Sequence, residues 1–178
     1  MGPGSRFPGE ATGLGVLDLG CRASQVAPQL LGCQLKVGSN RVILTELEAY
    51  EGANDPASHA CRGVTGRNRV MFEEAGRLYV YLCYGIHALA NIVVDREGNA
   101  GAVLVRGIMT AVGEVVSGPG RVTRYLGINL SDNGCDLQDG RIALDLDAPK
   151  LLPRSIAVGP RVGIRNGSDL EWRFIGSW

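Results

Sequence analysis

The pattern of apolar and polar positions over residues 42–50 predicts a β-strand. Successive side chains of a strand point to opposite faces, so every second residue shares a face. One predicted face is mixed in character and carries Leu44, Glu46, Glu48 and Tyr50. Two carboxylates on such a face are either solvated on an exposed sheet or gathered at a site, where an aromatic neighbour can tune one as a base.

β-branched and aromatic residues fill two further runs, residues 77–84 and 87–94, which meet at Gly85. Such runs around a glycine turn predict a β-hairpin. Shorter runs of similar composition predict four more strands: residues 102–106, 142–146, 161–164 and 172–175.

Apolar residues at helical spacing over residues 16–31 stop at Gly32, a typical helix end. Pro28 interrupts this stretch, so one long helix and two short ones both fit it. A second helix is predicted over residues 119–126, because a proline starts it and Gly127 follows it. Residues 51–69 lack periodicity and predict a long loop. Together these elements predict an α+β fold: a single compact domain with a curved, mainly antiparallel sheet and a protruding β-hairpin.

The chain of 178 residues, with 45% hydrophobic and 20% charged residues, fits one globular domain. We take residues 14–178 as this domain and residues 1–13 as a flexible N-terminus or a remnant of cloning. No apolar run approaches the ~18 residues of a membrane span, and no signal peptide is evident. Five cysteines without Cys-x-x-Cys spacing, together with two histidines, predict reduced thiols and no metal site, as in a cytoplasmic protein.

Charge is unevenly distributed along the chain, although the net charge is zero. Arginine accounts for 16 of the 18 basic residues, and its side chain suits bidentate phosphate contacts and stacking on bases. Residues 62–69 contain three arginines and no acid, whereas residues 132–147 contain five aspartates and one arginine. A neutral chain of this kind can still dock one face on a polyanion.

Aromatic side chains of the predicted hairpin are candidates for a binding site. Tyr79 and Tyr81 share one strand face, where both could equally pack the core. Tyr84 lies near the turn, where an aromatic side chain is unusual unless it has something to wedge into. His59, in the long loop, has no neighbour at the spacing of a metal partner.

The ordered combination of these motifs resembles the alkyladenine (3-methylpurine) DNA glycosylase family, of the type without a helix-hairpin-helix motif. The resemblance covers roughly residues 26–175 and rests on short motifs in chain order: residues 26–32, 46–50, 55–59, 67–72, 79–91, 104–106, 117–121, 126–128 and 161–164. It implies a fold similar to the carboxy-terminal domain of methionyl-tRNA formyltransferase. It also implies a monomeric, monofunctional enzyme of base excision repair, cytoplasmic or nucleoid-associated. Such an enzyme flips alkylated or deaminated purines, such as 3-methyladenine or hypoxanthine, out of double-stranded DNA and hydrolyses the N-glycosidic bond.

The resemblance assigns a role to each motif residue. Glu48 would be the general base that activates the attacking water, and Arg106 would support it. Four residues would form the base pocket, with the amide at its floor discouraging guanine: Tyr50, His59, Tyr81 and Asn91. Tyr84 would intercalate into the gap left by the flipped base. Three arginines would contact the DNA backbone: Arg67, Arg69 and Arg121.

No cofactor or metal is implied. The two lysines, Lys36 and Lys150, lie outside the motifs, which favours a water-using mechanism over Schiff-base chemistry. The chain departs from the family pattern where members usually carry a basic helical insertion, because only residues 108–116, without a basic side chain, precede the Ser-Gly-Pro segment. Two alternatives remain open: a catalytically silent nucleic-acid-binding module, and a nucleoside or glycoside hydrolase that uses Glu46 and Glu48 as paired carboxylates.

Overall fold

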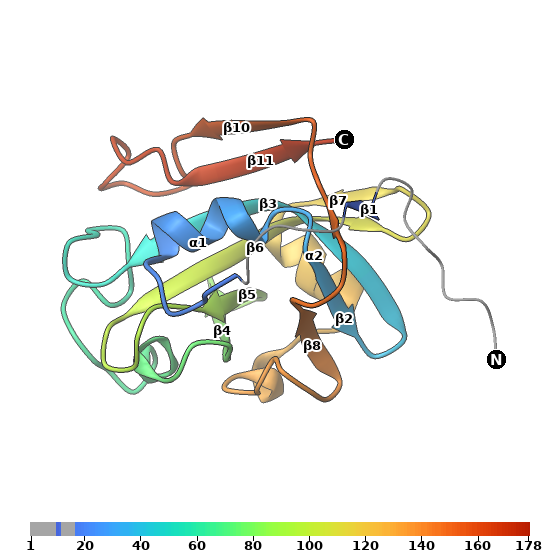
Figure 1. Cartoon of the computed structure of the whole chain (residues 1–178). Coiled ribbons are helices and arrows are strands. Elements are labelled where there is room, and N and C mark those ends of the chain that lie inside the picture. Colours follow the sequence, from blue (N-terminus) through green and yellow to red (C-terminus); the bar gives the residue numbers. More distant parts are fainter. Residues whose placement is uncertain (1–9, 12–16) are drawn as a thin grey trace.

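In the computed structural model, which describes residues 10–11 and 17–178, nine antiparallel strands form one curled sheet (Figure 1). Six strands form its main path in this order: β10 (Ser155–Gly159), β11 (Arg173–Ser177), β3 (Asn40–Glu51), β6 (Gly101–Thr110), β5 (His87–Val93) and β4 (Leu78–Cys83). Three strands pair beside this path: β2 (Gln34–Val37) with β3, β8 (Ile142–Asp145) with β2, and β7 (Val115–Ser117) with β6. A separate two-stranded ladder joins β1 (Glu10–Ala11) and β9 (Lys150–Leu151).

Two α-helices and two short 3-10 helices accompany the sheet: α1 (Ala23–Leu30), α2 (Pro119–Leu126), η1 (Arg69–Phe72) and η2 (Leu130–Asp132). Helix α2 has the predicted bounds. Helix α1 is shorter than the predicted stretch of residues 16–31 and contains Pro28, while residue 16 of that stretch lies outside the described residues. No helix in the described part of the chain has the length and apolar character that a membrane crossing requires.

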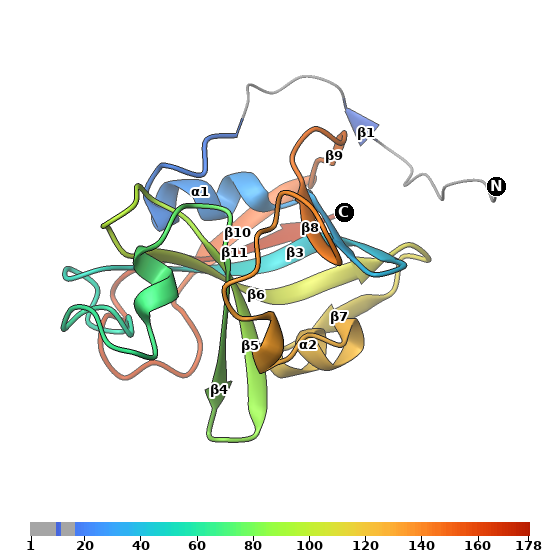
Figure 2. The same ribbon diagram turned by 90° about the horizontal axis from the view of Figure 1, so that it is seen from below.

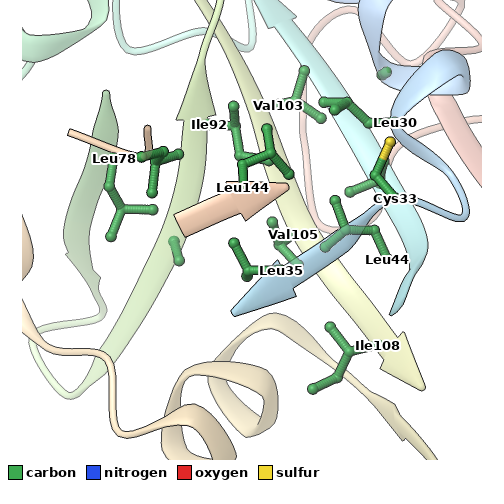
Figure 3. Packing of buried hydrophobic residues seen from close by; sticks show 14 of the residues in the cluster. Leu30, Cys33, Leu35, Leu44, Leu78, Ile92, Val103, Val105, Ile108 and Leu144 are labelled. Atoms are coloured by element: carbon green, nitrogen blue, oxygen red, sulfur yellow. The ribbon is translucent and has the colours of Figure 1, made fainter. Parts of the chain in front are cut away.

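The main hydrophobic core covers one face of the sheet (Figure 3). Helix α1 contributes Leu30, and the strands contribute side chains such as Leu44, Ile92 and Val105, all nearly or fully inaccessible to water. The predicted hairpin is confirmed as β4 and β5, and it projects away from the body of the molecule (Figure 2). The α+β fold, the single domain and the curled antiparallel sheet agree with the sequence prediction.

Bulges in β3 and β6 determine which side chains of β3 point into the core and which point away from it. Leu44 pairs with Ile108 and Leu47 with Val105, whereas Thr45 and Arg106 have no partner in the register. Leu44 and Leu47 therefore both enter the core, although strict alternation would place them on opposite faces. The prediction that Leu44 shares the face of Glu46 is wrong for this reason.

A glycine permits this bulge. A Cβ atom on Gly107 would lie 2.8 Å from the Glu46 Cβ and 2.9 Å from the Thr45 Oγ1, distances that side chains do not tolerate. Beyond the bulge, Glu46, Glu48 and Tyr50 lie on the face of β3 opposite the main core.

The predicted strand over residues 161–164 is wrong, because these residues form a loop between β10 and β11. Gly163 has a φ of +75°, outside the range of a strand, and the Arg161 and Val162 hydrogen-bonding groups contact β3 and its following loop instead of a neighbouring strand. The sequence prediction also omitted β2, β7 and β10. Strand β7 forms a tight hairpin with β6 where the family resemblance leads one to expect a basic insertion.

Candidate active site

Glu48 is a completely buried carboxylate with three partners. The backbone N–H of Val162 donates to its Oε1 at 2.7 Å, and the Tyr50 hydroxyl donates to its Oε2 at 2.8 Å. The Arg106 Nε lies 3.4 Å from Oε1. Burial raises the pKa of Glu48 above the ordinary glutamate value, against the hydrogen bond from Val162 and the charge of Arg106. Its affinity for a proton makes this carboxylate suited to act as a base.

Glu46 has a different environment two residues away. Its Oε1 accepts hydrogen bonds from the Nε of Arg106 at 3.0 Å and from the Nε of Arg173 at 2.8 Å, and the Ser117 hydroxyl donates to Oε2 at 3.4 Å. Burial opposes ionisation, but the two arginines outweigh it and lower the pKa of Glu46. Neither carboxylate is solvated on an exposed sheet face, since Glu46 is 7% exposed and Glu48 is 0% exposed.

Aromatic rings surround a narrow slot beside this pair. The slot has a volume of about 30 Å³ and is lined by Tyr50, Ala57, His59, Met71, Tyr79, Tyr81, Asn91 and Ala102. All four predicted base-pocket residues are therefore brought together. Asn91 is nearly buried, and its Nδ2 donates to the carbonyl oxygen of Tyr79 at 3.1 Å, which fixes the orientation of the amide.

A wider cleft of about 440 Å³ opens above the slot. It is lined by Tyr50, His59 and Tyr81 of the slot, by Arg106, by Tyr84 and by residues 162–166 among others. The three partners of Glu48, namely Tyr50, Arg106 and Val162, all border this cleft. Glu48 thus lies one layer beneath a space that is open to solvent.

The titratable rings of the slot are all held neutral. Burial, followed by the negative charge of Glu48, raises the pKa of Tyr50, and burial also raises the pKa of Tyr79 and Tyr81. Desolvation and then the nearby charge of Arg67 lower the pKa of His59, whose Nδ1 lies 3.1 Å from the Tyr79 hydroxyl. A slot with neutral aromatic walls accepts a flat, weakly solvated ligand.

Tyr84 stands at the tip of the projecting hairpin and is 89% exposed. The N–H of Ile86 donates to the Cys83 carbonyl at 3.2 Å and closes a turn with Tyr84 and Gly85 at its centre. Their φ values are +51° and +71°, as in a type I′ turn. Glycine and asparagine favour this conformation, whereas a tyrosine is strained in it. Strain at an exposed aromatic side chain suggests a function.

The three predicted backbone-contacting arginines are all exposed, and each has different neighbours. Arg67 turns toward the hairpin, where its guanidinium lies 5.2 Å from the Tyr81 ring centroid and donates to the Leu82 carbonyl at 3.1 Å. Arg69 lies near Glu73, with 3.6 Å between the Nε and the carboxylate. Arg121 lies in the first turn of α2 and shares a hollow of about 520 Å³ with Tyr84 and His87.

Comparison with known proteins gives this geometry a context. The model of a family described as methylpurine-DNA glycosylase (MPG) matches residues 18–177. The chain belongs to this family. The family is one of DNA glycosylases, so the protein is a hydrolase of base excision repair that acts on DNA. The resemblance drawn from the motifs is confirmed.

Relatives from bacteria and an archaeon support the assignment, and all three carry the name "Putative 3-methyladenine DNA glycosylase". The Rickettsia conorii protein is 41% identical over 152 residues, covering 84% of this chain and 82% of the relative. The Methanoculleus marisnigri protein is 41% identical over 170 residues, covering 84% and 87%. The Rhodopseudomonas palustris protein is 38% identical over 164 residues, covering 84% and 78%.

Sequence reasoning missed several residues of this candidate site. The strand face that Tyr79 shares with Tyr81 was recognised from the sequence, but it left core packing equally open for Tyr79, which the structure places in the lining of the slot. Arg173 and the Asp55–Arg161 ion pair carry no such local signal, because their partners are distant in the sequence. Within the described residues, no group of three or more His, Cys, Asp or Glu side chains is arranged to hold a metal ion.

Proposed function

We propose that this DNA glycosylase flips alkylated or deaminated purines out of double-stranded DNA and hydrolyses their N-glycosidic bonds with Glu48 as the general base. The observation that carries the proposal is the position of Glu48. It lies directly beneath a cleft walled by Tyr50 and Tyr81, hydrogen-bonded to the hydroxyl of one of those tyrosines. A proton-accepting carboxylate next to an aromatic slot is the arrangement that base excision requires.

The damaged base would stack between Tyr50 and Tyr81, with His59 and Asn91 at its edges. Aromatic walls favour a cationic alkylated purine through cation–π attraction. The slot must open for this purpose, because about 30 Å³ has room for a water molecule but not for a purine. Side-chain rotations of this kind are common when a partner binds.

Glu48 has the acceptor capacity to hold the attacking water. A carboxylate offers about four acceptor positions, and Val162, Arg106 and Tyr50 approach it as donors. A water could donate to the remaining position while the negative charge stabilises the oxocarbenium-like sugar. The water would lose its proton to Glu48, its oxygen would bond the sugar carbon, and the base would leave with the electrons of the N-glycosidic bond.

Tyr84 would fill the gap in the duplex, and Arg67, Arg69 and Arg121 would contact phosphates. The exposed, strained position of Tyr84 supports a wedge better than a packing role. The paired-carboxylate alternative gains no support, because Glu46 is held by Arg106 and Arg173.

The positions of the lysines support a monofunctional mechanism. Lys36 lies on β2 and Lys150 on β9, where its Nζ donates to the Gln29 carbonyl at 2.8 Å. Neither lysine lines the slot or the cleft, so no lysine amine is placed there for a Schiff base. We further propose that residues 14–178 act as a monomer and that the fold is similar to that of the formyltransferase carboxy-terminal domain.

Single-turnover assays on defined oligonucleotides test this function. With enzyme in excess over duplexes that carry one 3-methyladenine or one hypoxanthine, we expect release of the base and an intact abasic site that breaks only after alkali. The same bases in free nucleosides are the control. Release from nucleosides alone would indicate a nucleoside hydrolase, and lesion binding without release would indicate a silent module. Trapping of a covalent adduct by borohydride would contradict the monofunctional mechanism.

A further inference from the structure

An ion pair is buried beside the site, between the loop that follows β3 and the loop between β10 and β11. The side chains of Arg161 and Asp55 are both 0% exposed. Two parallel hydrogen bonds of 2.6 and 2.8 Å join the guanidinium to the carboxylate. Arg161 also donates to the carbonyl oxygen of Ala49 at 2.8 Å, so it fixes the end of β3 as well.

Asp55 connects this arginine to the loop that carries His59. Its carboxylate accepts from the N–H of Glu51 at 3.0 Å and from the N–H of Ala57 at 3.1 Å. The Asp55 carboxylate therefore accepts hydrogen bonds from the Arg161 guanidinium and from both of these backbone N–H groups. Three segments thus meet at the pair: the end of β3, the histidine loop and the loop after Gly159.

Arg161 is also connected to the two residues that we assign to chemistry and base stacking. Its guanidinium lies 4.6 Å from the centroid of the Tyr50 ring and 5.2 Å from that of Trp172. The next residue in the chain, Val162, donates its N–H to Glu48 at 2.7 Å. Arg161 therefore positions two donors to the Glu48 carboxylate. It fixes the neighbouring Val162 N–H, which donates to Oε1, and it supports the ring of Tyr50, whose hydroxyl donates to Oε2.

We propose that Arg161 is a positioning residue for base excision: through Val162 and Tyr50 it holds the Glu48 carboxylate in its reactive place. This inference rests on the function proposed above. Stability alone is a poor explanation for the pair, since a buried ion pair is often no more stabilising than apolar residues of similar volume. The Nε of Arg161 is, moreover, a buried donor without a partner among the described residues, which is a cost to folding.

Two variants test the role without leaving a buried charge unpaired. The double variant Asp55→Asn/Arg161→Gln replaces the ion pair by a neutral amide pair. Arg161→Lys keeps the charge, but an ammonium group lacks the planar fork that joins Asp55 to Ala49 and covers Tyr50. Arg154→Gln, which changes an exposed arginine before β10, is the matched control. Circular dichroism at the assay temperature checks that each protein is folded.

The first measurement is the single-turnover rate of base release from lesion duplex at saturating enzyme, over a range of pH. We expect a loss on the order of 10²-fold in the double variant, as small misplacements of reacting groups produce, and a smaller loss in Arg161→Lys. The Val162 hydrogen bond favours the ionised form of Glu48 and so lowers its pKa. Both variants should weaken this hydrogen bond, so the acid limb of the pH–rate profile should move to higher pH.

The second measurement is the ¹³C titration of the Glu48 carboxyl, which needs no substrate. Its midpoint should rise in both variants and stay unchanged in Arg154→Gln. Other charged or titratable groups that face Glu48 are the same in all of these proteins: Glu46, Tyr50, Tyr81, Arg106 and Arg173. An unchanged midpoint, a wild-type rate, or a lower rate with an unmoved acid limb would overturn the positioning role. If the wild-type protein released no base while the midpoint still rose, the proposed function would fail and the positioning of Glu48 would stand.

Discussion

Glu46 and Glu48 lie two residues apart on one face of β3, yet the pKa of Glu46 is lowered and the pKa of Glu48 is raised. Hydrogen bonds from Arg106 and Arg173 keep Glu46 ionised despite its burial, whereas burial raises the pKa of Glu48. Two titratable groups whose environments separate their pKa values are often assigned different tasks in an active site. Here the more basic carboxylate is the one beside the cleft.

Glu48→Gln should reduce the single-turnover rate of base release by roughly 10²–10⁴-fold, the usual contribution of a general base. Binding to lesion DNA should remain near normal, because the amide keeps the shape of the side chain. Glu46→Gln is the matched control on the same strand and should reduce the rate less. Equal losses in the two variants would contradict the assignment of Glu48 as the base.

The two substitutions should also affect stability in opposite ways. Glu46 has a lowered pKa, so its contribution to stability is present above the ordinary value of about 4.3 and is lost as the pH falls through the folded-state pKa. Glu46→Gln should therefore lower the free energy of unfolding at pH 7 by about 1–3 kcal/mol, because charged hydrogen bonds are lost. Urea titrations should show this difference shrinking below about pH 4.

Glu48 has a raised pKa, so its favourable contribution is present below about pH 4.3 and is lost as the pH rises through the folded-state pKa. Glu48→Gln should accordingly be at least as stable as the wild type at pH 7, with any advantage disappearing on acidification. A Glu48→Gln protein that is much less stable than Glu46→Gln at pH 7 would contradict this assignment of charges.

Tyr84→Asn should stabilise the fold and impair function. Asparagine tolerates positive φ and is preferred before glycine in type I′ turns, so we expect a gain of about 1 kcal/mol in the free energy of unfolding. The loss of the ring should weaken capture of the flipped state by about 1–3 kcal/mol. Urea titration measures the first effect, and the fluorescence of 2-aminopurine beside the lesion measures the second. An unchanged fluorescence signal would contradict the wedge role and indicate that Tyr84 is an ordinary exposed side chain.

Local sequence signals were sufficient for the elements closest to the site. The hairpin of β4 and β5 and helix α2 were predicted from alternation, a turn glycine and helix-terminal residues, all of which act over a few positions. The bulges at Thr45 and Arg106 could not be predicted in this way, because the register of β3 depends on a strand some 60 residues away. Leu44 was consequently placed on the wrong face, although Glu46, Glu48 and Tyr50 were correctly grouped.

Residues 161–164 show the same limit more clearly. Their β-branched content predicts a strand, but Arg161 is bound to Asp55, which lies 106 positions away in the sequence. A buried guanidinium and a positive φ at Gly163 are incompatible with a strand edge. The motif around Arg161 was recognised by its resemblance to the family, while its role in the site required the fold.

The salt dependence of DNA binding should be shallow. Strand β7 and its turn stand where a basic insertion is expected, so we expect phosphate contacts mainly from Arg67, Arg69 and Arg121. Three contacts predict a slope of log affinity against log salt of about −2.7. Arg121→Gln should reduce its magnitude by about 0.9, whereas Arg41→Gln, at the opposite end of β3 from Tyr50, should leave it unchanged. A slope several times steeper would indicate a larger phosphate footprint.

Asn91→Ser should relax discrimination against guanine. The Asn91 amide lies in the lining of the slot, with its Nδ2 already bound to the Tyr79 carbonyl, so it cannot turn freely to suit a new ligand. Guanine differs from hypoxanthine by an amino group at the two-position, and a fixed amide at that edge rejects it by overlap and by leaving polar groups unpaired. Removing such repulsion should broaden the substrate range rather than accelerate the preferred reaction. The measurement is the single-turnover release of 7-methylguanine relative to hypoxanthine, and an unchanged ratio would mean that Asn91 does not contact the two-position edge.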